Sequence, residues 1–437
     1  MIWVYILAAV ILSWIITPRP KYWGNYIWLL LPIELYGIQL GGAVIKPYMI
    51  FGFFIILTNL TTIKFPTLIY FISFLLVLSD CFTGLFLSSI MQHIMVMIIF
   101  IIACGYLSAQ KGVIDADEIA NVSIGTTLGY GIVYSIAYIL TYYGIVLPDV
   151  YTTDRYTTGI VYYGALTGLD NAIALRLRGF CIDPNGVINP LILGAAFALN
   201  NLFYESQKKW KNMLAIIIYF SVVYFSRSRA GMISSLAMVA YLLIMYLKNA
   251  TNAKQTTLPV LGGIAFITLI MIGNYNSIVK GLKEYFEARS SFTGSAGRYT
   301  IWKYNLNYLI DNGYLLTGVG QNKIHDYTLW GKPCHNTWLE WVSGTGVFIG
   351  LFMSSIFICS PIRYLRKNKH KGIVYLERIR IIILAYYVLL IAITTVDYIA
   401  CPTMIIQCII FLYGTYYSLS ESSGNCMNKA AQDSCTI

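Results

Sequence analysis

The sequence predicts an all-α membrane protein, a polytopic transmembrane helical bundle, from three observations. The chain of 437 residues is 58% hydrophobic and 11% charged, whereas charged residues make up about a quarter of a typical globular domain. Apolar runs of about 20 residues recur from end to end, and each is long enough to cross the hydrocarbon layer. The runs are continuous rather than alternating, which indicates helices rather than a closed barrel.

Twelve or thirteen spans are predicted, within one transmembrane domain over 1–419 that is followed by a disordered cytoplasmic tail over 420–437. The first run lacks the basic region and cleavage site of a secretory signal, so we expect it to remain as a span. The candidate spans are 1–17, 26–43, 47–60, 66–80, 88–108, 122–146, 188–205, 211–226, 230–247, 257–274, 336–359, 378–396 and 401–419.

The distribution of basic residues predicts which connections face the cytoplasm. Lys and Arg gather in short cytoplasmic loops, and here one set of alternate connections and the tail carry 17 of the 30 basic residues. Topology and contact with anionic lipids therefore explain most of the net charge of +11 without a nucleic-acid partner. These residues are Arg19, Lys21, Lys64, Lys111, Lys208, Lys209, Lys211, Lys248, Lys254, Arg363, Arg366, Lys367, Lys369, Lys371, Arg378, Arg380 and Lys429.

Two long loops, 147–187 and 275–335, and the tight turn at 227–229 are predicted on the opposite, extracytoplasmic side. In that turn, SRSRAG, two guanidiniums lie at the edge of the hydrocarbon, and Ser228 is placed to cap the helix that follows. A helix N-terminus beside arginines suits an anion, and guanidinium geometry suits phosphate. Arginines that merely anchor two helix ends are the alternative, but their position on the side poor in Arg favours an anion site.

Two more arginine clusters and a histidine lie on the same predicted side. Arg176 and Arg178 precede the span at 188 in RLRGFCIDPNG, where glycine and proline indicate a shaped loop. Gly297 and Arg298 begin the motif GR-x3-W, which leads to Gly318-Val-Gly320. His335 and Asn336 then lie where this loop meets a span, and the alternative for the pair is an ordinary helix start.

In this order and spacing, the motifs resemble those of the O-antigen ligase and polymerase family, over roughly residues 170–360. The resemblance implies a lipid-linked glycosyltransferase on the periplasmic face of the bacterial inner membrane. By motif match its functional residues would be Arg176, Arg229, Arg298 and His335, supported by Ser228 and Asn336, with Arg178 and Arg227 as further pyrophosphate-binding candidates. Because the serine–arginine motif is doubled here, the choice between Arg229 and Arg227 stays open.

These residue types suit the implied chemistry. Transfer from a pyrophosphate-linked sugar develops negative charge on the leaving group, which fixed arginines stabilise. A neutral imidazole, with a pKa of about 6.5, can take the proton of the acceptor hydroxyl. The implied partners are an undecaprenyl-pyrophosphate-linked glycan donor, a glycan or lipid A-core acceptor, membrane lipids and other polysaccharide-assembly proteins. No metal, cofactor or nucleic acid is expected.

Three functions are compatible with this pattern. A polymerase that joins lipid-linked repeat units is favoured by the Ile-, Tyr- and Lys-rich composition. A ligase that moves the glycan onto lipid A-core shares its motifs and mechanism. A flippase or transporter would place its charges along a central path near the midplane rather than at one rim.

Other candidates are weaker on residue type or position. Asp115, Asp117 and Glu118 are interpreted as a solvated cytoplasmic loop, His325 as a surface residue, and Glu340 as lying off the face of His335. Acids in or beside spans are functional candidates by default, here Glu34 and Asp397. Cys181 and Cys334 adjoin proposed site elements, and two free thiols are favoured over a disulfide between them.

Overall fold

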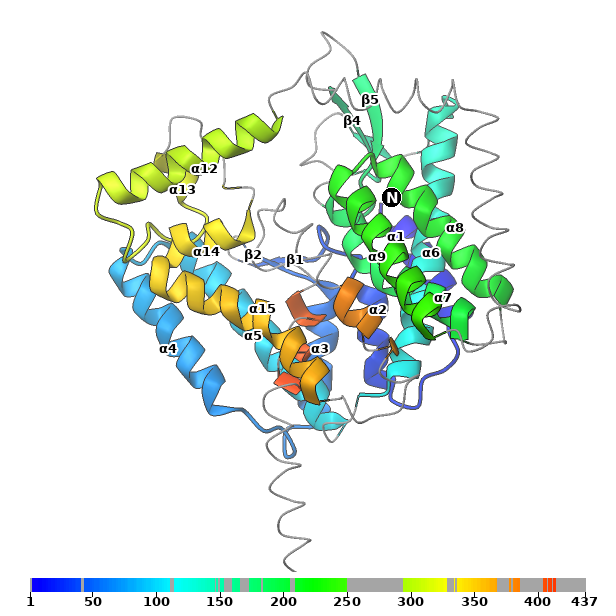
Figure 1. Ribbon diagram of the computed structural model, residues 1–437, viewed down its shortest axis with the longest axis horizontal. Coiled ribbons are helices and arrows are strands. Elements are labelled where there is room, and N and C mark those ends of the chain that lie inside the picture. Colours follow the sequence, from blue (N-terminus) through cyan, green and yellow to red (C-terminus); the bar gives the residue numbers. More distant parts are fainter. Residues whose placement is uncertain are drawn as a thin grey trace, which may run out of the picture.

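The described part of the chain is mainly helical in the computed structural model (Figure 1). The structure describes residues 2–40, 43–110, 114–145, 147, 150–152, 159–165, 173–181, 184–204, 209–249, 294–327, 334, 336–367, 377–378, 380–385, 404–406, 408–410 and 412–413. The predicted span 257–274 and the tail 420–437 lie outside these residues, and so do Asp397 and most of the last two predicted spans.

The helices reproduce most of the predicted spans within a few residues. The N-terminal half contains α1 (Ile2–Ile16), α2 (Ile27–Leu30), α3 (Pro47–Thr58), α4 (Thr67–Phe82), α5 (Leu87–Ala109) and α6 (Ala116–Tyr142). The second half contains α7 (Asn189–Tyr204), α8 (Lys209–Ser226), α9 (Arg229–Asn249), α12 (Gly294–Asp311), α13 (Ile324–Tyr327), α14 (Thr337–Thr345) and α15 (Val347–Lys367). Short 3-10 turns lie at η1 (Trp23–Tyr26) and η2 (Gly186–Ile188).

Two small sheets interrupt the helical pattern. β1 (Ile38–Leu40) and β2 (Ala43–Ile45) form an antiparallel hairpin. In the first long loop, β3 (Tyr151–Thr152) pairs parallel with β4 (Val161–Ala165), and β4 pairs antiparallel with β5 (Ile173–Leu177). The register sets Tyr162 opposite Arg176. The loop that carries the RLRG motif is therefore a small sheet, which the apolar pattern of the sequence did not predict.

Helix α6 is the centre of one half of the bundle, where it packs against α1, α7 and α8. Two glycines permit the close approach of α1: a Cβ on Gly125 would lie 2.0 Å from Thr17 Oγ1, and one on Gly129 would lie 2.1 Å from Ser13 Oγ. Small residues four apart are a common device for bringing membrane helices into backbone contact. A second half is built on α3, α4, α5, α14 and α15.

The predicted span 26–43 is wrong. The chain is helical as far as Leu30, turns, and enters the β1–β2 hairpin. Pro32 has no N–H to continue a helix, and Gly37 lies so close to the hairpin that a Cβ there would meet the carbonyl oxygen of Ile45 at 2.2 Å. The apolar composition of this segment reflects burial within the protein rather than a transmembrane helix, since Leu29, Leu31 and Ile33 are all buried.

The predicted span 336–359 is divided into two helices, α14 and α15, at Gly346. This glycine has a φ of 83°, a value that side chains rarely permit. A Cβ there would lie 1.9 Å from the carbonyl oxygen of Leu316. Gly346 therefore both ends α14 and lets residues 314–318 pass against the break.

We expect Gly346→Ala to lower the apparent thermal unfolding midpoint in detergent, equivalent to at least ~2 kcal/mol, because a strained φ and a steric clash add. Gly313→Ala is the matched control, since Gly313 has a φ of 75° but no atom within 4 Å of its added Cβ. The control therefore measures the free-energy cost of the strained φ alone, without a steric clash. Equal shifts in the two variants would contradict the packing role of Gly346.

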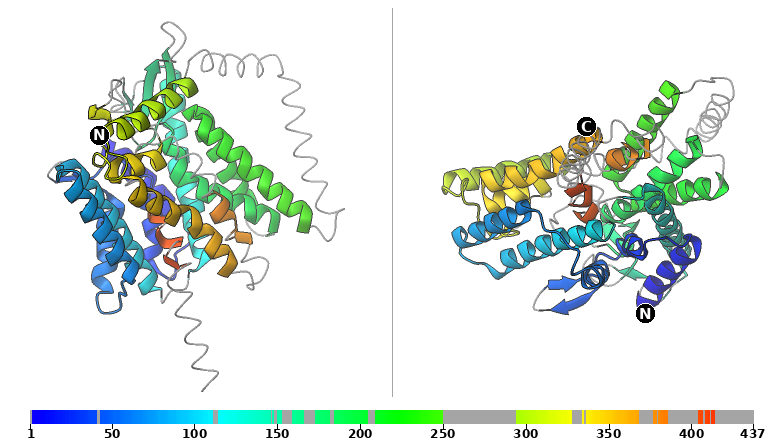
Figure 2. Two further views of the ribbon diagram at one scale, coloured as in Figure 1. Left: turned by 60° about the vertical axis from the view of Figure 1, so that its left-hand side comes forward. Right: turned by 90° about the horizontal axis from the view of Figure 1, so that it is seen from below.

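Among the described residues, α5 and α6 are the helices long and apolar enough to cross a membrane, while several shorter helices, including α1, α3 and α4, are also apolar. Figures 1 and 2 show β4 and β5, from the first predicted outer loop, at the same end of the bundle as α12, from the second. Contacts between segments predicted as cytoplasmic also occur: the backbone N–H of Lys21 donates to Glu118 at 2.8 Å, and Arg378 pairs with Asp117. The assignment of these ends to sides of a membrane stays a prediction.

Candidate functional site

The proposed base, His335, belongs to residues 334–336, called the histidine turn below, and both of its neighbours are held by hydrogen bonds. His335 lies outside the described residues, but Cys334 and Asn336 are described. The Asn336 side chain accepts hydrogen bonds from the backbone N–H groups of Trp338 and Leu339 at 3.0 and 3.2 Å, and so caps α14. For Asn336, the alternative of an ordinary helix start is therefore the one that the structure shows.

Cys334 is bonded through its amide, carbonyl and thiol, and is completely buried. Its N–H donates to Glu340 Oε2 at 3.3 Å, and its carbonyl accepts from Trp302 Nε1 at 2.7 Å. Its sulfur lies 3.2 Å from Asn305 Nδ2 and 3.6 Å from Ser343 Oγ. Burial, with the nearby Glu340 carboxyl second, raises the pKa of the thiol well above its usual value. The residue before His335 therefore has a defined position.

The bond from Trp302 to the Cys334 carbonyl joins α12 to the histidine turn across 32 residues. Trp302 is the tryptophan of the GR-x3-W motif, and Arg298 lies one helical turn before it on α12. The side chain of Arg298 is not described, but its helix is therefore anchored to Cys334, the residue before the proposed base. The sequence motif includes this tryptophan, but the pattern did not predict its hydrogen bond to Cys334.

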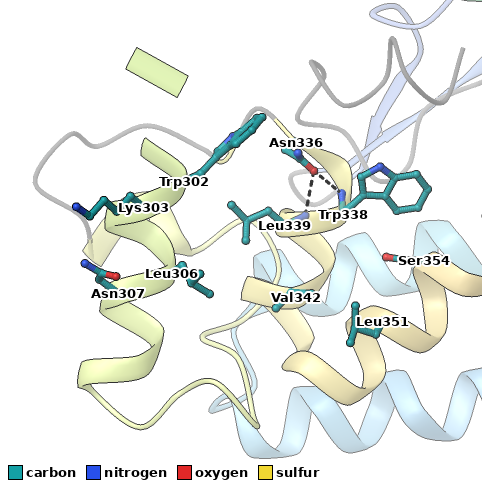
Figure 3. Close-up of a pocket in the computed structure, with 10 residues that line it drawn as sticks. All are labelled: Trp302, Lys303, Leu306, Asn307, Asn336, Trp338, Leu339, Val342, Leu351 and Ser354. Atoms are coloured by element: carbon teal, nitrogen blue, oxygen red, sulfur yellow. Dashed lines mark hydrogen bonds between the residues drawn. The ribbon is translucent and has the colours of Figure 1, made fainter. Parts of the chain in front are cut away.

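A pocket of about 530 Å³ opens between α12 and the α14–α15 pair (Figure 3). Leu306, Leu339, Val342 and Leu351 make it largely apolar. Polar groups at its edge come from both sides, and Asn336 places it next to the histidine turn. The remaining lining residues are Trp302, Lys303, Asn307, Trp338 and Ser354. Its apolar interior with a few polar groups is typical of a site for a small molecule or a lipid segment.

The arginine turn between α8 and α9 contacts the RLRG loop. Ser228 Oγ accepts from the backbone N–H of Gly231 at 3.1 Å, so the predicted helix cap is confirmed, and its hydroxyl donates to Asn185 Oδ1 at 2.8 Å. Arg176 Nε donates to the carbonyl of Ser226 at 3.1 Å. The first and second arginine clusters, which are 50 residues apart, therefore meet.

Arg227 lies in this turn with a positive φ of 50°, and its side chain hydrogen-bonds Tyr138. Arg229, two residues after Arg227, is the first residue of α9, and its side chain is not described. A bulky residue at positive φ is uncommon and is often associated with function. The geometry places Arg176 and Arg227 at one turn.

Arg178 has a different environment from Arg176. It is completely buried, and its Nε and Nη2 donate to the carbonyl of Gly159 at 3.1 and 2.8 Å. A guanidinium in such a position holds a loop together. We therefore separate Arg178 from the anion-binding residues, although the sequence grouped the two.

The acidic candidates and His325 have separate structural roles. Asp115 caps α6 by accepting from the N–H groups of Asp117 and Glu118, so these acids form the partly exposed start of a helix rather than a loop. His325 is one-third exposed and pairs with Asp326 at 3.0 Å, which fits a surface residue. Glu34 is buried beside the thiol of Cys181.

The two cysteines are not bridged. Cys181 and Cys334 are both buried free thiols, as favoured from the sequence. They pack in separate hydrophobic clusters, Cys181 with residues of α6, α7 and α8, and Cys334 with Leu309, Val319 and Ile324. The histidine turn is therefore joined to its surroundings by hydrogen bonds and packing.

Residues 214–354 match the protein-family model described as O-antigen ligase. Over these residues, from α8 into α15, the chain is similar to the O-antigen ligases. The match confirms the resemblance inferred from the motifs and includes the arginine turn, α12, the histidine turn and every residue that lines the pocket. It indicates a membrane enzyme of the O-antigen ligase or polymerase type, acting on a lipid-linked glycan and a glycan acceptor. No curated protein matches the chain.

Proposed function

We propose that this O-antigen ligase-family protein is a polymerase that joins undecaprenyl-pyrophosphate-linked repeat units at the periplasmic face of the bacterial inner membrane. The observation that carries the proposal is the bond from Trp302 to Cys334, which brings the helix of Arg298, the histidine turn and the pocket together.

In the proposed reaction, neutral His335 takes the proton of an acceptor hydroxyl as its oxygen attacks the anomeric carbon of the donor. The bond from that carbon to the pyrophosphate breaks, and the electron pair leaves with the pyrophosphate. Arg298, Arg229 and Arg176 stabilise this charge. Asn336 and Ser228 support the histidine and the arginine turn through the helix caps described above.

The pocket suits the apolar segment of the donor that adjoins its pyrophosphate. Four aliphatic side chains supply the wall, and Lys303, Asn307 and Asn336 supply polar groups where the pyrophosphate begins. Because Arg176 contacts the arginine turn at the end of the bundle where α12 also lies, this arrangement supports an enzyme over a flippase or transporter, whose charges would follow a central path.

We expect Leu306→Trp to raise the KM for the lipid-linked donor at least tenfold, because the larger side chain fills the pocket. A tenfold change corresponds to about 1.4 kcal/mol of binding. Leu316→Trp is the control, since Leu316 belongs to the same region, is exposed and does not line the pocket. An unchanged KM in Leu306→Trp would contradict donor binding there.

Purified protein supplied with the lipid-linked repeat unit separates the polymerase from the ligase. A polymerase converts this single substrate into a ladder of longer chains. A ligase leaves it unchanged until lipid A-core is added, and then forms a glycan–lipid A-core product. A ligase result would replace the proposed acceptor and leave the proposed site in place.

A further inference from the structure

A buried polar cluster joins α4 to α5 close to the turn between them. Asp80 Oδ1 accepts from Ser89 Oγ at 2.7 Å, and Asp80 Oδ2 lies 2.9 Å from His93 Nδ1. All three residues are buried. Burying a carboxylate is costly unless it is well hydrogen-bonded, and an apolar helical hairpin does not require one.

The cluster reaches the polar loop that precedes the histidine turn. Ser89 Oγ accepts from the backbone N–H of Gln321 at 3.0 Å, across 232 residues of sequence. A hydroxyl has one proton and two lone pairs. Because the proton of Ser89 is committed to Asp80, a lone pair is left to receive the Gln321 N–H.

From Gln321 the hydrogen bonds continue to the residue before His335. Gln321 Nε2 donates to the carbonyl of Glu340 at 3.1 Å, and Glu340 Oε2 accepts from the N–H of Cys334 at 3.3 Å. The loop is also paired to the end of α14, because the N–H of Val319 donates to Ser343 and that of Gly320 donates to Gly344. A continuous chain of contacts therefore leads from Asp80 to the histidine turn.

We infer that Asp80 and Ser89 are positioning residues for glycan transfer, acting through Gln321 and Glu340 to set the place of His335. The inference rests on the proposed function. The contact of His93 Nδ1 with Asp80 Oδ2 helps to hold the carboxyl group in place. Since a displacement of about 1 Å in a reacting group can cost a hundredfold in rate, we expect loss of this chain to reduce kcat.

The experiment compares Ser89→Ala with the wild type in the assay of purified protein with the lipid-linked repeat unit. We expect kcat to fall at least tenfold while the donor KM changes less than twofold, because the pocket residues are untouched. Ser108→Ala is the matched control: Ser108 lies on the same helix and also accepts from a backbone N–H, that of Lys64 at 3.3 Å, near the opposite end. Its kcat should equal that of the wild type.

Two further variants keep the inference testable if Ser89→Ala folds poorly. Asp80→Asn retains an acceptor for Ser89, so its kcat should stay within threefold of the wild-type value. In Asp80→Ala, kcat should fall by as much as in Ser89→Ala. Gln321→Ala removes the next bond, and the double variant with Ser89→Ala should be no slower than the slower single variant, because both break one chain.

Wild-type kcat in folded Ser89→Ala or Asp80→Ala, or an equal fall in Ser108→Ala, would overturn the inference. These outcomes differ from failure of the proposed function, in which the wild-type protein itself forms no product from the lipid-linked donor.

Discussion

His335→Ala is expected to abolish glycan transfer while the protein stays in the membrane at its normal level. A general base contributes about 10²- to 10⁴-fold in rate, and the neighbouring Cys334 and Asn336 are held by bonds that this substitution does not remove. The measurement is the rate of chain growth from the lipid-linked donor, with membrane abundance determined in parallel. Activity of the unaltered protein should rise with pH through the pKa of the imidazole, because the neutral form is the base.

His325→Ala is the matched control for this variant. It removes the other histidine of the same predicted outer loop, one that is partly exposed and paired with Asp326. Its rate should equal that of the unaltered protein. Near-normal product from His335→Ala would remove the proposed base and return this residue to a simple helix start beside the Asn336 cap.

Arg229→Lys is expected to reduce transfer at least tenfold, although the charge is preserved. A lysine presents a point charge and cannot make the two parallel hydrogen bonds with which a guanidinium binds phosphate. Arg229 begins α9, whose N-terminus is capped by Ser228, and the neighbouring carbonyl of Ser226 receives Arg176. The loss should appear in kcat, because the charge on the leaving pyrophosphate develops in the transition state.

Arg363→Lys provides the comparison, since Arg363 is an exposed residue of α15 on the predicted cytoplasmic side. Full activity in Arg229→Lys would indicate simple electrostatic attraction. A large loss in Arg227→Lys with full activity in Arg229→Lys would instead identify the first arginine of the doubled motif as the one that binds pyrophosphate.

The sequence predicted helices correctly where an apolar run contains no residue that interrupts the helical backbone. α3, α4, α5, α7, α8 and α9 lie within a few residues of their predicted spans. The errors at 26–43 and 336–359 have the same origin: hydropathy reports burial, whereas Pro32 and Gly346 decide whether the backbone stays helical. The β3–β5 sheet was missed because its strands are short and lie in a polar loop.

The site was predictable as residue types but not as contacts. The motifs indicated Ser228 and Asn336 as caps because a cap is a local feature, readable from the residues that follow it. The bonds of Trp302 to Cys334 and of Ser89 to Gln321 depend on tertiary packing across 32 and 232 residues, and no local pattern reports them. Arg176 lies in β5 and Arg178 directly follows that strand. Their side chains nevertheless bond to different segments, Arg176 to Ser226 and Arg178 to Gly159, and the tertiary fold decides this.

The burial of Cys334 has a consequence for how the protein survives in an oxidising compartment. The thiolate is the form of cysteine that reacts with oxidants and disulfides, and access controls the reaction. Here the sulfur is shielded, and its raised pKa keeps the proton on it. At the proposed periplasmic position, the thiol next to the proposed base is therefore protected from oxidation and from disulfide exchange.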